Sequence, residues 1–139
     1  MKDLEKAHRI LEEGGYTCVL CKDEEVRTST KRGVAPLMEL WTDSTDVIGW
    51  SAADKVVGKA TALLYRLLKV KAVYALIISE SALETLQAGG IETRYDRLVS
   101  HIVNREGTGR CPMETATAHI DDPALAPAAI RAKLKELAK

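Results

Sequence analysis

The segment WSAADKVVGKATALLYRLL, residues 50–68, constrains the fold more than any other part of the chain. Ser51 precedes an apolar run, and Asp54 follows three residues later, which is a pattern typical of a helix N-terminal cap. We therefore predict one long central helix over residues 50–68. Its apolar residues recur at intervals of three and four, the spacing of a buried helix face: Val56, Val57, Ala60, Leu63, Leu64, Leu67 and Leu68.

The segments around this helix alternate between helix and strand patterns. The continuous apolar run at 72–78 has the length of a strand covered on both faces. A helix at 79–88 separates it from a strand at 91–95, and such a crossover pairs two strands in parallel. With 46% hydrophobic residues in 139, the chain predicts a single α/β domain over residues 1–139. The other expected elements are a helix at 4–11, a strand hairpin at 16–20 and 26–30, a helix at 33–41, a helix that begins at Cys111, and a helix at 123–137.

The composition excludes several classes of function. Lys and Arg number 20, as do Asp and Glu, so the chain has no net positive field that would attract nucleic acid. No apolar run reaches the roughly 20 residues that span a bilayer, and the first residues are charged rather than signal-like. Three cysteines, an odd number, fit free thiols in a reducing compartment. We expect a soluble, cytoplasmic protein with no nucleic-acid partner and no membrane partner.

Two residue patterns raise the question of a metal site. Cys18 and Cys21 form a C-x-x-C motif, but residues three apart in a strand point to opposite faces, so we interpret both as structural. His8, His101 and His119 have no ligand spacing to another His or Cys, and a metal site needs three or four convergent ligands. We therefore expect no metal and no cofactor.

The start of the predicted central helix is a candidate anion site. Unpaired N–H groups and the helix dipole attract an anion, Gly58 allows a close approach, and Lys55 and Lys59 would lie on one helix face. The alternative is structural: Asp54 completes the cap that Ser51 begins, Gly58 permits tight packing, and the lysines are solvated. Both interpretations stay open, because a Gly within a helix costs about 1 kcal/mol relative to Ala and needs a reason.

A second candidate site lies at Cys111. Pro112 suits the first turn of a helix, and a thiol at a helix start has its thiolate favoured by the dipole. Glu114 provides a neighbouring carboxylate. The alternative is that Cys111 is a buried small hydrophobe, since no His stands nearby in the sequence as a base.

Three stretches of the sequence together resemble the domain of unknown function 1893 family. They are ADKVVGK within residues 52–60, VYALIISESAL at 73–83 and NREGTGRCPME at 104–114. The resemblance covers nearly the whole chain. It implies a cytidine-deaminase-like fold, a three-layer helix/sheet/helix sandwich whose mixed sheet has parallel central strands.

The resemblance does not extend to the zinc ligands of a deaminase. Such an enzyme carries His-x-Glu at the start of its central helix and Pro-Cys-x-x-Cys at the next strand-to-helix turn. Residues 51–54 read SAAD and residues 79–83 read SESAL, so neither place keeps the histidine or cysteine zinc ligands of these motifs. The fold that the resemblance implies would bring five polar residues to the former zinc site: Asp54, Lys55, Ser79, Glu80 and Ser81.

We therefore hypothesise a metal-independent site for an anionic or nucleotide-like small molecule. Lys55 and Lys59 would attract the ligand, and Asp54 or Glu80 would act as general base. The alternative is a non-catalytic, self-associating or regulatory module, and a zinc-dependent deaminase is the third interpretation. Whether the chain is an enzyme stays open, and the expectation of a homo-oligomer rests on the resemblance alone. The candidate catalytic residues are Asp54, Lys55, Cys111 and Glu114, and the candidate ligand-binding residues are Ser51, Gly58, Lys59, Ser79, Glu80 and Ser81.

Overall fold

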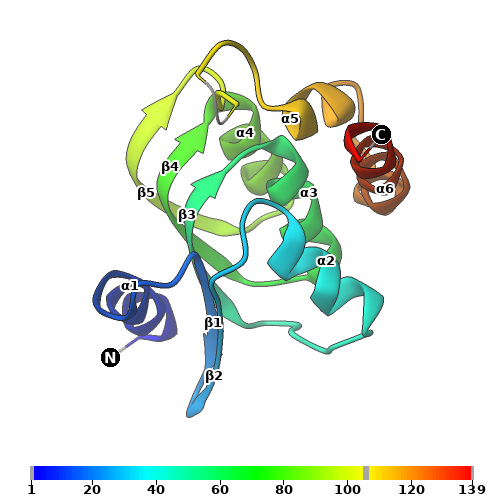
Figure 1. Ribbon diagram of the computed structural model, residues 1–139. Helices are drawn as coiled ribbons and strands as arrows, with labels where there is room; N and C mark the ends of the chain where they lie inside the picture. Colours follow the sequence, from blue (N-terminus) through cyan, green and yellow to red (C-terminus); the bar gives the residue numbers. More distant parts are fainter. Residues whose placement is uncertain (1, 105–106, 139) are drawn as a thin grey trace.

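The computed structural model describes residues 2–104 and 107–138 (Figure 1). Its elements in chain order are α1 (Asp3–Gly14), β1 (Cys18–Lys22), β2 (Glu25–Ser29), α2 (Ala35–Thr42), β3 (Ser51–Val57), α3 (Lys59–Leu68), β4 (Ala72–Ser79), α4 (Glu80–Ala88), β5 (Glu92–Val99), α5 (Pro112–Thr117), a short 3-10 helix (Pro123–Leu125) and α6 (Ala126–Leu137). In the described part of the chain, no helix is both long and apolar enough to cross a membrane.

The five strands form one mixed sheet in the order β2-β1-β3-β4-β5. β1 pairs antiparallel with β2 and with β3, whereas β3, β4 and β5 run parallel. Helix α1 packs on one face of the sheet, α2, α3 and α4 cover the other, and α5 and α6 pack on the outer side of α3 (Figure 1). The predicted helix/sheet/helix sandwich with parallel central strands is confirmed.

Each face of the sheet has its own hydrophobic cluster. The smaller cluster lies under α1, and the larger one lies between the sheet and the helices of the other face. Because side chains alternate along a strand, Cys18 of β1 belongs to the larger cluster and Cys21 to the smaller. The two thiols therefore face opposite sides of the sheet, as their spacing predicts.

The prediction of one helix over residues 50–68 is wrong in its first half. Ser51–Val57 is strand β3, and α3 begins only at Lys59, after an extended Gly58 (φ −97°, ψ −179°). β3 lies between β1 and β4 and is covered on both faces, so Ala52 and Ala53 are both fully buried. A strand buried on both faces is continuously apolar, and a short run of this kind cannot be told from a buried helix by its spacing.

This correction changes two interpretations. Ser51 and Asp54 are strand residues, so they do not form a helix cap. Lys55 belongs to β3 and Lys59 to α3, so the two lysines do not share a helix face.

The elements after α3 match the sequence patterns. β4, α4 and β5 form the predicted parallel crossover, although β5 continues to Val99. Pro112 opens α5, directly after Cys111. Arg105 and Glu106, in the Gly-rich stretch 104–110, lie outside the described residues.

Candidate functional site

A cavity of about 500 Å³ lies at the C-terminal end of β3, where α3 begins. The loop between β2 and α2 and the residues around the start of α5 complete its walls. This volume lies in the range of small-molecule sites. The lining residues are Thr17, Cys18, Thr30, Lys31, Arg32, Gly33, Val34, Pro36, Asp54, Lys55, Val56, Gly58, Ala60, Thr61, Ile102, Cys111, Met113 and Glu114.

Asp54 is a buried carboxyl group in the wall of this cavity. Its side chain is only 6% exposed, and its Oδ2 accepts a hydrogen bond from the Tyr65 hydroxyl at 2.7 Å. Burial disfavours the charged carboxylate and raises the pKa of Asp54 from 3.8 to about 7, although hydrogen bonds from Tyr65 and from the backbone of Val56 oppose this shift. Asp54 therefore exchanges its proton near neutral pH.

Two protonated groups stand beside Asp54. Burial raises the pKa of Tyr65 well above its usual value, and the Asp54 carboxylate raises it further. Burial likewise raises the pKa of Cys18, whose Sγ lies 3.4 Å from the Tyr65 hydroxyl oxygen. Tyr65 and Cys18 thus keep their protons near neutral pH, and Tyr65 acts as a hydrogen-bond donor to Asp54.

The starts of α3 and α4 lie side by side but are capped differently. Because β3 and β4 are parallel, with Val57 paired to Ile78, both helices begin at the same edge of the sheet (Figure 1). At α4 the Ser79 hydroxyl accepts a hydrogen bond from the Ala82 N–H at 3.2 Å. At α3 the N-cap is Gly58, which has no capping side chain, and the first turn has no acidic residue. The N-terminal N–H groups of α3 are therefore not capped by their own helix.

Glu114 of α5 reaches across to this edge. Its Oε1 accepts a hydrogen bond from the Ile102 N–H at 3.0 Å, and its Oε2 accepts one from the Ser81 hydroxyl at 3.2 Å. A Cβ added at Gly58 would lie only 3.2 Å from Glu114 Cγ. The missing side chain of Gly58 thus makes room for Glu114, which gives this glycine a packing reason.

Among the described residues, three basic side chains line the cavity, and a fourth, Lys59, points away from it. Arg32 and Lys55 are exposed, line the cavity, and make no side-chain hydrogen bond or ion pair within the described residues. Lys31 also lines the cavity but pairs with Glu39. Lys59 is 9% exposed and donates from Nζ to the Ala118 carbonyl at 2.9 Å, so it serves the packing of the α5 region instead.

The structure brings together some of the predicted site residues and separates others. Those that line the cavity are Asp54, Lys55, Gly58, Cys111 and Glu114. Ser81 contacts Glu114, and the Ser79 and Ser81 hydroxyl oxygens are 3.3 Å apart. Ser51 is buried at the opposite end of β3, Glu80 is exposed at the first position of α4, and Lys59 faces α5, so these three do not line the cavity.

Sequence reasoning missed Tyr65 and Arg32. Tyr65 is fully buried in α3 at a position that fits the apolar stripe. Its hydroxyl was the available signal, because a buried tyrosine needs a hydrogen-bond partner and Asp54 is a buried acid within an apolar strand. Arg32 gave no signal, because it comes to the cavity on a loop far from β3 in the sequence.

The helix starts do not fit the zinc ligands of a deaminase. With α3 beginning after Gly58, the place of a His-x-Glu motif is held by Gly58, Lys59 and Ala60. None of these offers a histidine, thiolate or carboxylate ligand, and the start of α4 offers serine hydroxyls near Glu114. This donor set does not match a zinc site of the deaminase type.

Comparisons with known proteins identify the family. A family model described as a domain of unknown function, DUF1893, matches residues 6–134. A crystal structure of a DUF1893 family protein from Thermotoga maritima matches with a TM-score of 0.86 at 26% identity, over 96% of this chain and 91% of that chain.

A second T. maritima structure is a diaminohydroxyphosphoribosylaminopyrimidine deaminase/5-amino-6-(5-phosphoribosylamino)uracil reductase. It matches with a TM-score of 0.44 at 12% identity, over 83% of this chain and 40% of that chain, a likeness too low to support an argument. No curated protein matches the sequence. The family match, which the three sequence stretches predict, extends over most of the chain: the protein belongs to the DUF1893 family.

Proposed function

We propose that the cavity binds a small anionic molecule at the start of α3 and that Asp54 exchanges a proton with it. The single observation that carries this proposal is the burial of Asp54 in the cavity wall, which raises its pKa to about 7. A general acid or base works best when its pKa lies near the operating pH. Buried carboxyl groups with such shifted pKa values are concentrated at functional sites.

Binding of an anion is supported by two features of the cavity. The uncapped N–H groups of α3 point their dipoles toward a site lined by Gly58, Ala60 and Thr61. Arg32 and Lys55 add two positive charges from two other elements. A phosphate or carboxylate group placed there would meet the helix dipole and the two cations. The nearby Glu114 carboxylate accepts hydrogen bonds from the Ile102 N–H and the Ser81 hydroxyl, which offset its negative charge.

Proton transfer is supported by the surroundings of Asp54. The Tyr65 hydroxyl keeps its proton and fixes the carboxyl group through the 2.7 Å hydrogen bond. The other Asp54 oxygen, Oδ1, accepts a long hydrogen bond of 3.4 Å from the Val56 N–H. We propose that Oδ1 exchanges the proton with the ligand and that Tyr65 is a positioning residue, which holds the carboxyl group through Oδ2. Glu80, the other candidate base, is exposed outside the cavity.

The walls of the cavity favour one part of the predicted ligand class. None of the described lining residues is aromatic, so a nucleobase would find no aromatic side chain on which to stack. We therefore propose a phosphosugar or a small carboxylate as the ligand, and a nucleotide would bind through its phosphate. Absence of a metal requirement remains part of the proposal.

Cys111 is proposed as a second reactive group of the same cavity. It is partly exposed, whereas Cys18 and Cys21 are buried and burial raises the pKa of both thiols. We expect a thiol reagent to label Cys111 first. Equal labelling rates for the three cysteines would remove Cys111 from the proposed site.

The binding test is a thermal-shift titration with inorganic phosphate, ribose 5-phosphate, AMP and citrate. A ligand of the native state raises the melting temperature by mass action. We expect at least one of these probes to do so in the wild type and to lose the effect in the double variant Arg32→Gln/Lys55→Gln. Lys22→Gln, at an exposed position at the end of β1, is the matched control and should keep the full shift.

The outcomes test the anion site and separate an enzyme from a non-catalytic module. No shift with any probe, or an unchanged shift in the double variant, contradicts the anion site. A ligand that binds to both wild type and Asp54→Asn, and is turned over only by the wild type, supports an enzyme. A ligand that binds and is never altered supports the non-catalytic module, for which self-association stays a prediction.

A further inference from the structure

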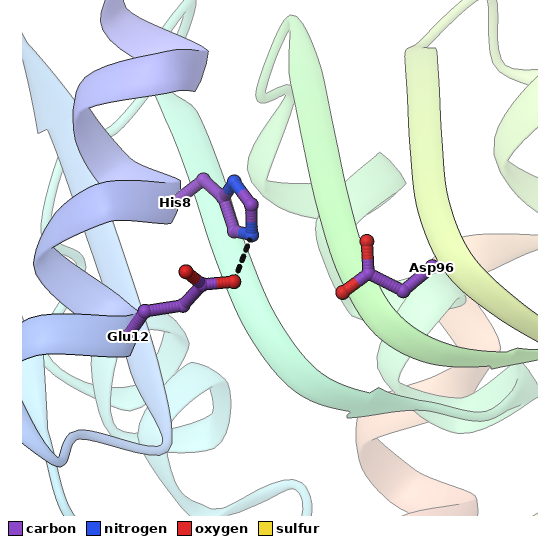
Figure 2. Close-up of side chains that lie close together, drawn as sticks. All are labelled: His8, Glu12 and Asp96. Carbon is purple, nitrogen blue, oxygen red and sulfur yellow. Dashed lines mark ion pairs between the residues drawn. The ribbon is translucent and has the colours of Figure 1, made fainter.

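The face of the sheet that carries α1 holds a group of three side chains able to bind a metal ion. They are His8, Glu12 and Asp96, and one ligand atom from each lies within 4.8 Å of the others (Figure 2). His8 and Glu12 come from successive turns of α1, and Asp96 comes from the edge strand β5. Figure 2 shows the three side chains pointing toward one another across the strand between them.

Tyr74 of β4 holds two of these three groups in place. The His8 ring stacks on the Tyr74 ring, with centroids 3.7 Å apart and planes inclined by 14°. The Tyr74 hydroxyl donates a hydrogen bond to the Asp96 carboxylate. Support of this kind from a neighbouring side chain is typical of metal ligands, because it fixes their orientation before the ion arrives.

The Nε2 atom of His8 is a buried polar atom without a hydrogen-bond partner among the described residues. It is shielded from solvent and forms no hydrogen bond of acceptable geometry with the residues that the structure describes. Yet it lies only 2.7 Å from Glu12 Oε1. The two atoms are at ion-pair distance without hydrogen-bond angles (Figure 2), so both can turn toward one ion placed between them and Asp96.

We propose that His8, Glu12 and Asp96 bind a divalent transition-metal ion, for which Zn²⁺ is the probe. Residues four apart lie on one face of a helix, so His8 and Glu12 can approach one ion together. An imidazole nitrogen with two carboxylates suits Zn²⁺ or a similar first-row ion, whereas Mg²⁺ and Ca²⁺ prefer oxygen ligands alone. The proposal revises the expectation from the sequence that His8 is not a ligand and that no metal is bound.

The bound ion would join the N-terminal helix to the edge of the sheet. α1 packs against β1, β3 and β4 and makes few contacts, if any, with β5. The metal would add a link from α1 to β5 across β4. The cavity beside Asp54 lies on the opposite face of the sheet, with Tyr65 of α3, so the two sites can be tested separately.

The test uses untagged, chelator-treated protein and titrates it with Zn²⁺ by calorimetry, and with Co²⁺ by visible absorption. We expect one ion per chain, a rise in melting temperature, and d–d bands of Co²⁺ bound to nitrogen and oxygen ligands. Glu12→Gln keeps the size of the side chain, and Asp96→Asn keeps an acceptor for the Tyr74 hydroxyl. Each should weaken Zn²⁺ binding at least about tenfold.

Glu13→Gln is the matched control, because Glu13 is an exposed carboxylate of α1 outside the group of three. Its Zn²⁺ affinity should equal that of the wild type. The proposal is overturned if the wild type binds no Zn²⁺ up to about 1 mM. It is equally overturned if Glu12→Gln and Asp96→Asn bind as well as Glu13→Gln, or if only Cys111→Ser removes binding.

Discussion

The two faces of the sheet place carboxyl groups in opposite surroundings. On the α3 face, Asp54 is 6% exposed in the cavity wall, and burial raises its pKa to about 7. On the α1 face, Asp96 is exposed and the Glu12 side chain is 55% exposed beside a histidine. The same chemical group thus suits proton transfer on one face and ion binding on the other, and burial decides which.

The hydrophobic cluster on the α3 face is also larger and more enclosed than the one on the α1 face. Leu64 of α3 and Leu11 of α1 are equally buried, but Leu64 belongs to the larger cluster. α3 is enclosed by the sheet and by helices α2, α4, α5 and α6, whereas α1 packs mainly on the sheet. The largest expected effects of substitution therefore lie on the α3 face.

Leu64→Ala should destabilise the protein more than Leu11→Ala. We expect losses in the free energy of unfolding of about 4 and about 2 kcal/mol, because the cost grows with the cavity that remains and α1 can move to fill its own. Urea unfolding of both variants measures the difference. Equal losses would show that the two clusters are equally rigid and would break the comparison.

Tyr65→Phe should have a smaller effect that depends on pH. The lost hydroxyl donates to Asp54 and lowers its pKa, so removing it should raise that pKa above about 7. The loss of stability should be about 2 kcal/mol at pH 8, where Asp54 is ionised, and about 1 kcal/mol at pH 5. Tyr16→Phe is the control, since Tyr16 makes no hydroxyl hydrogen bond within the described residues. A pH-independent loss in Tyr65→Phe would contradict the assigned role.

Glu12→Gln should have the smallest effect on the metal-free protein. The His8–Glu12 pair is partly solvated, and pairs of this kind contribute less than about 0.5 kcal/mol. Urea unfolding in the presence of a chelator should give a change within that limit. A loss above 1 kcal/mol, about twice that limit, would mean that the pair itself, without an ion, stabilises α1 on the sheet.

Local patterns in the sequence predicted much of the fold, and the errors have a physical cause. The run at 72–78 and its crossover predicted β4, α4 and β5 because a parallel strand is apolar on both faces. β3 is also apolar on both faces, and this made it indistinguishable from a helix in the sequence. Its residues Ala52, Ala53 and Val57 fit a buried helix as well as a buried strand. Gly58, which follows the last strand residue, separates β3 from α3 and does not lie within a helix.

The candidate sites were less accessible to sequence reasoning. The cavity is lined by the four candidate catalytic residues: Asp54, Lys55, Cys111 and Glu114. The topology of the fold brings them together, and local sequence patterns do not reveal that topology. The partners that fix their chemistry come from distant segments: Arg32 from a loop, and Tyr65 from the next element. Asp96 joins His8 only because β5 pairs beside β4. Spacing along the chain cannot reveal such contacts.

Asp54 should titrate near neutral pH, and the pH dependence of stability measures this directly. The pKa of Asp54 is raised on folding, from 3.8 to about 7, so its contribution to stability is present below pH 4 and is lost as the pH rises to about 7. Between pH 4 and pH 8, the free energy of unfolding of the wild type should fall by up to about 4 kcal/mol relative to that of Asp54→Asn, whose amide does not titrate.

Urea unfolding of both proteins at each pH gives this difference, in which the other ionisable groups cancel. We expect the difference to change between pH 4 and pH 7 and to be constant above pH 8. A difference that stays constant from pH 4 to pH 8, or that changes in favour of wild type as the pH rises, would contradict this expectation.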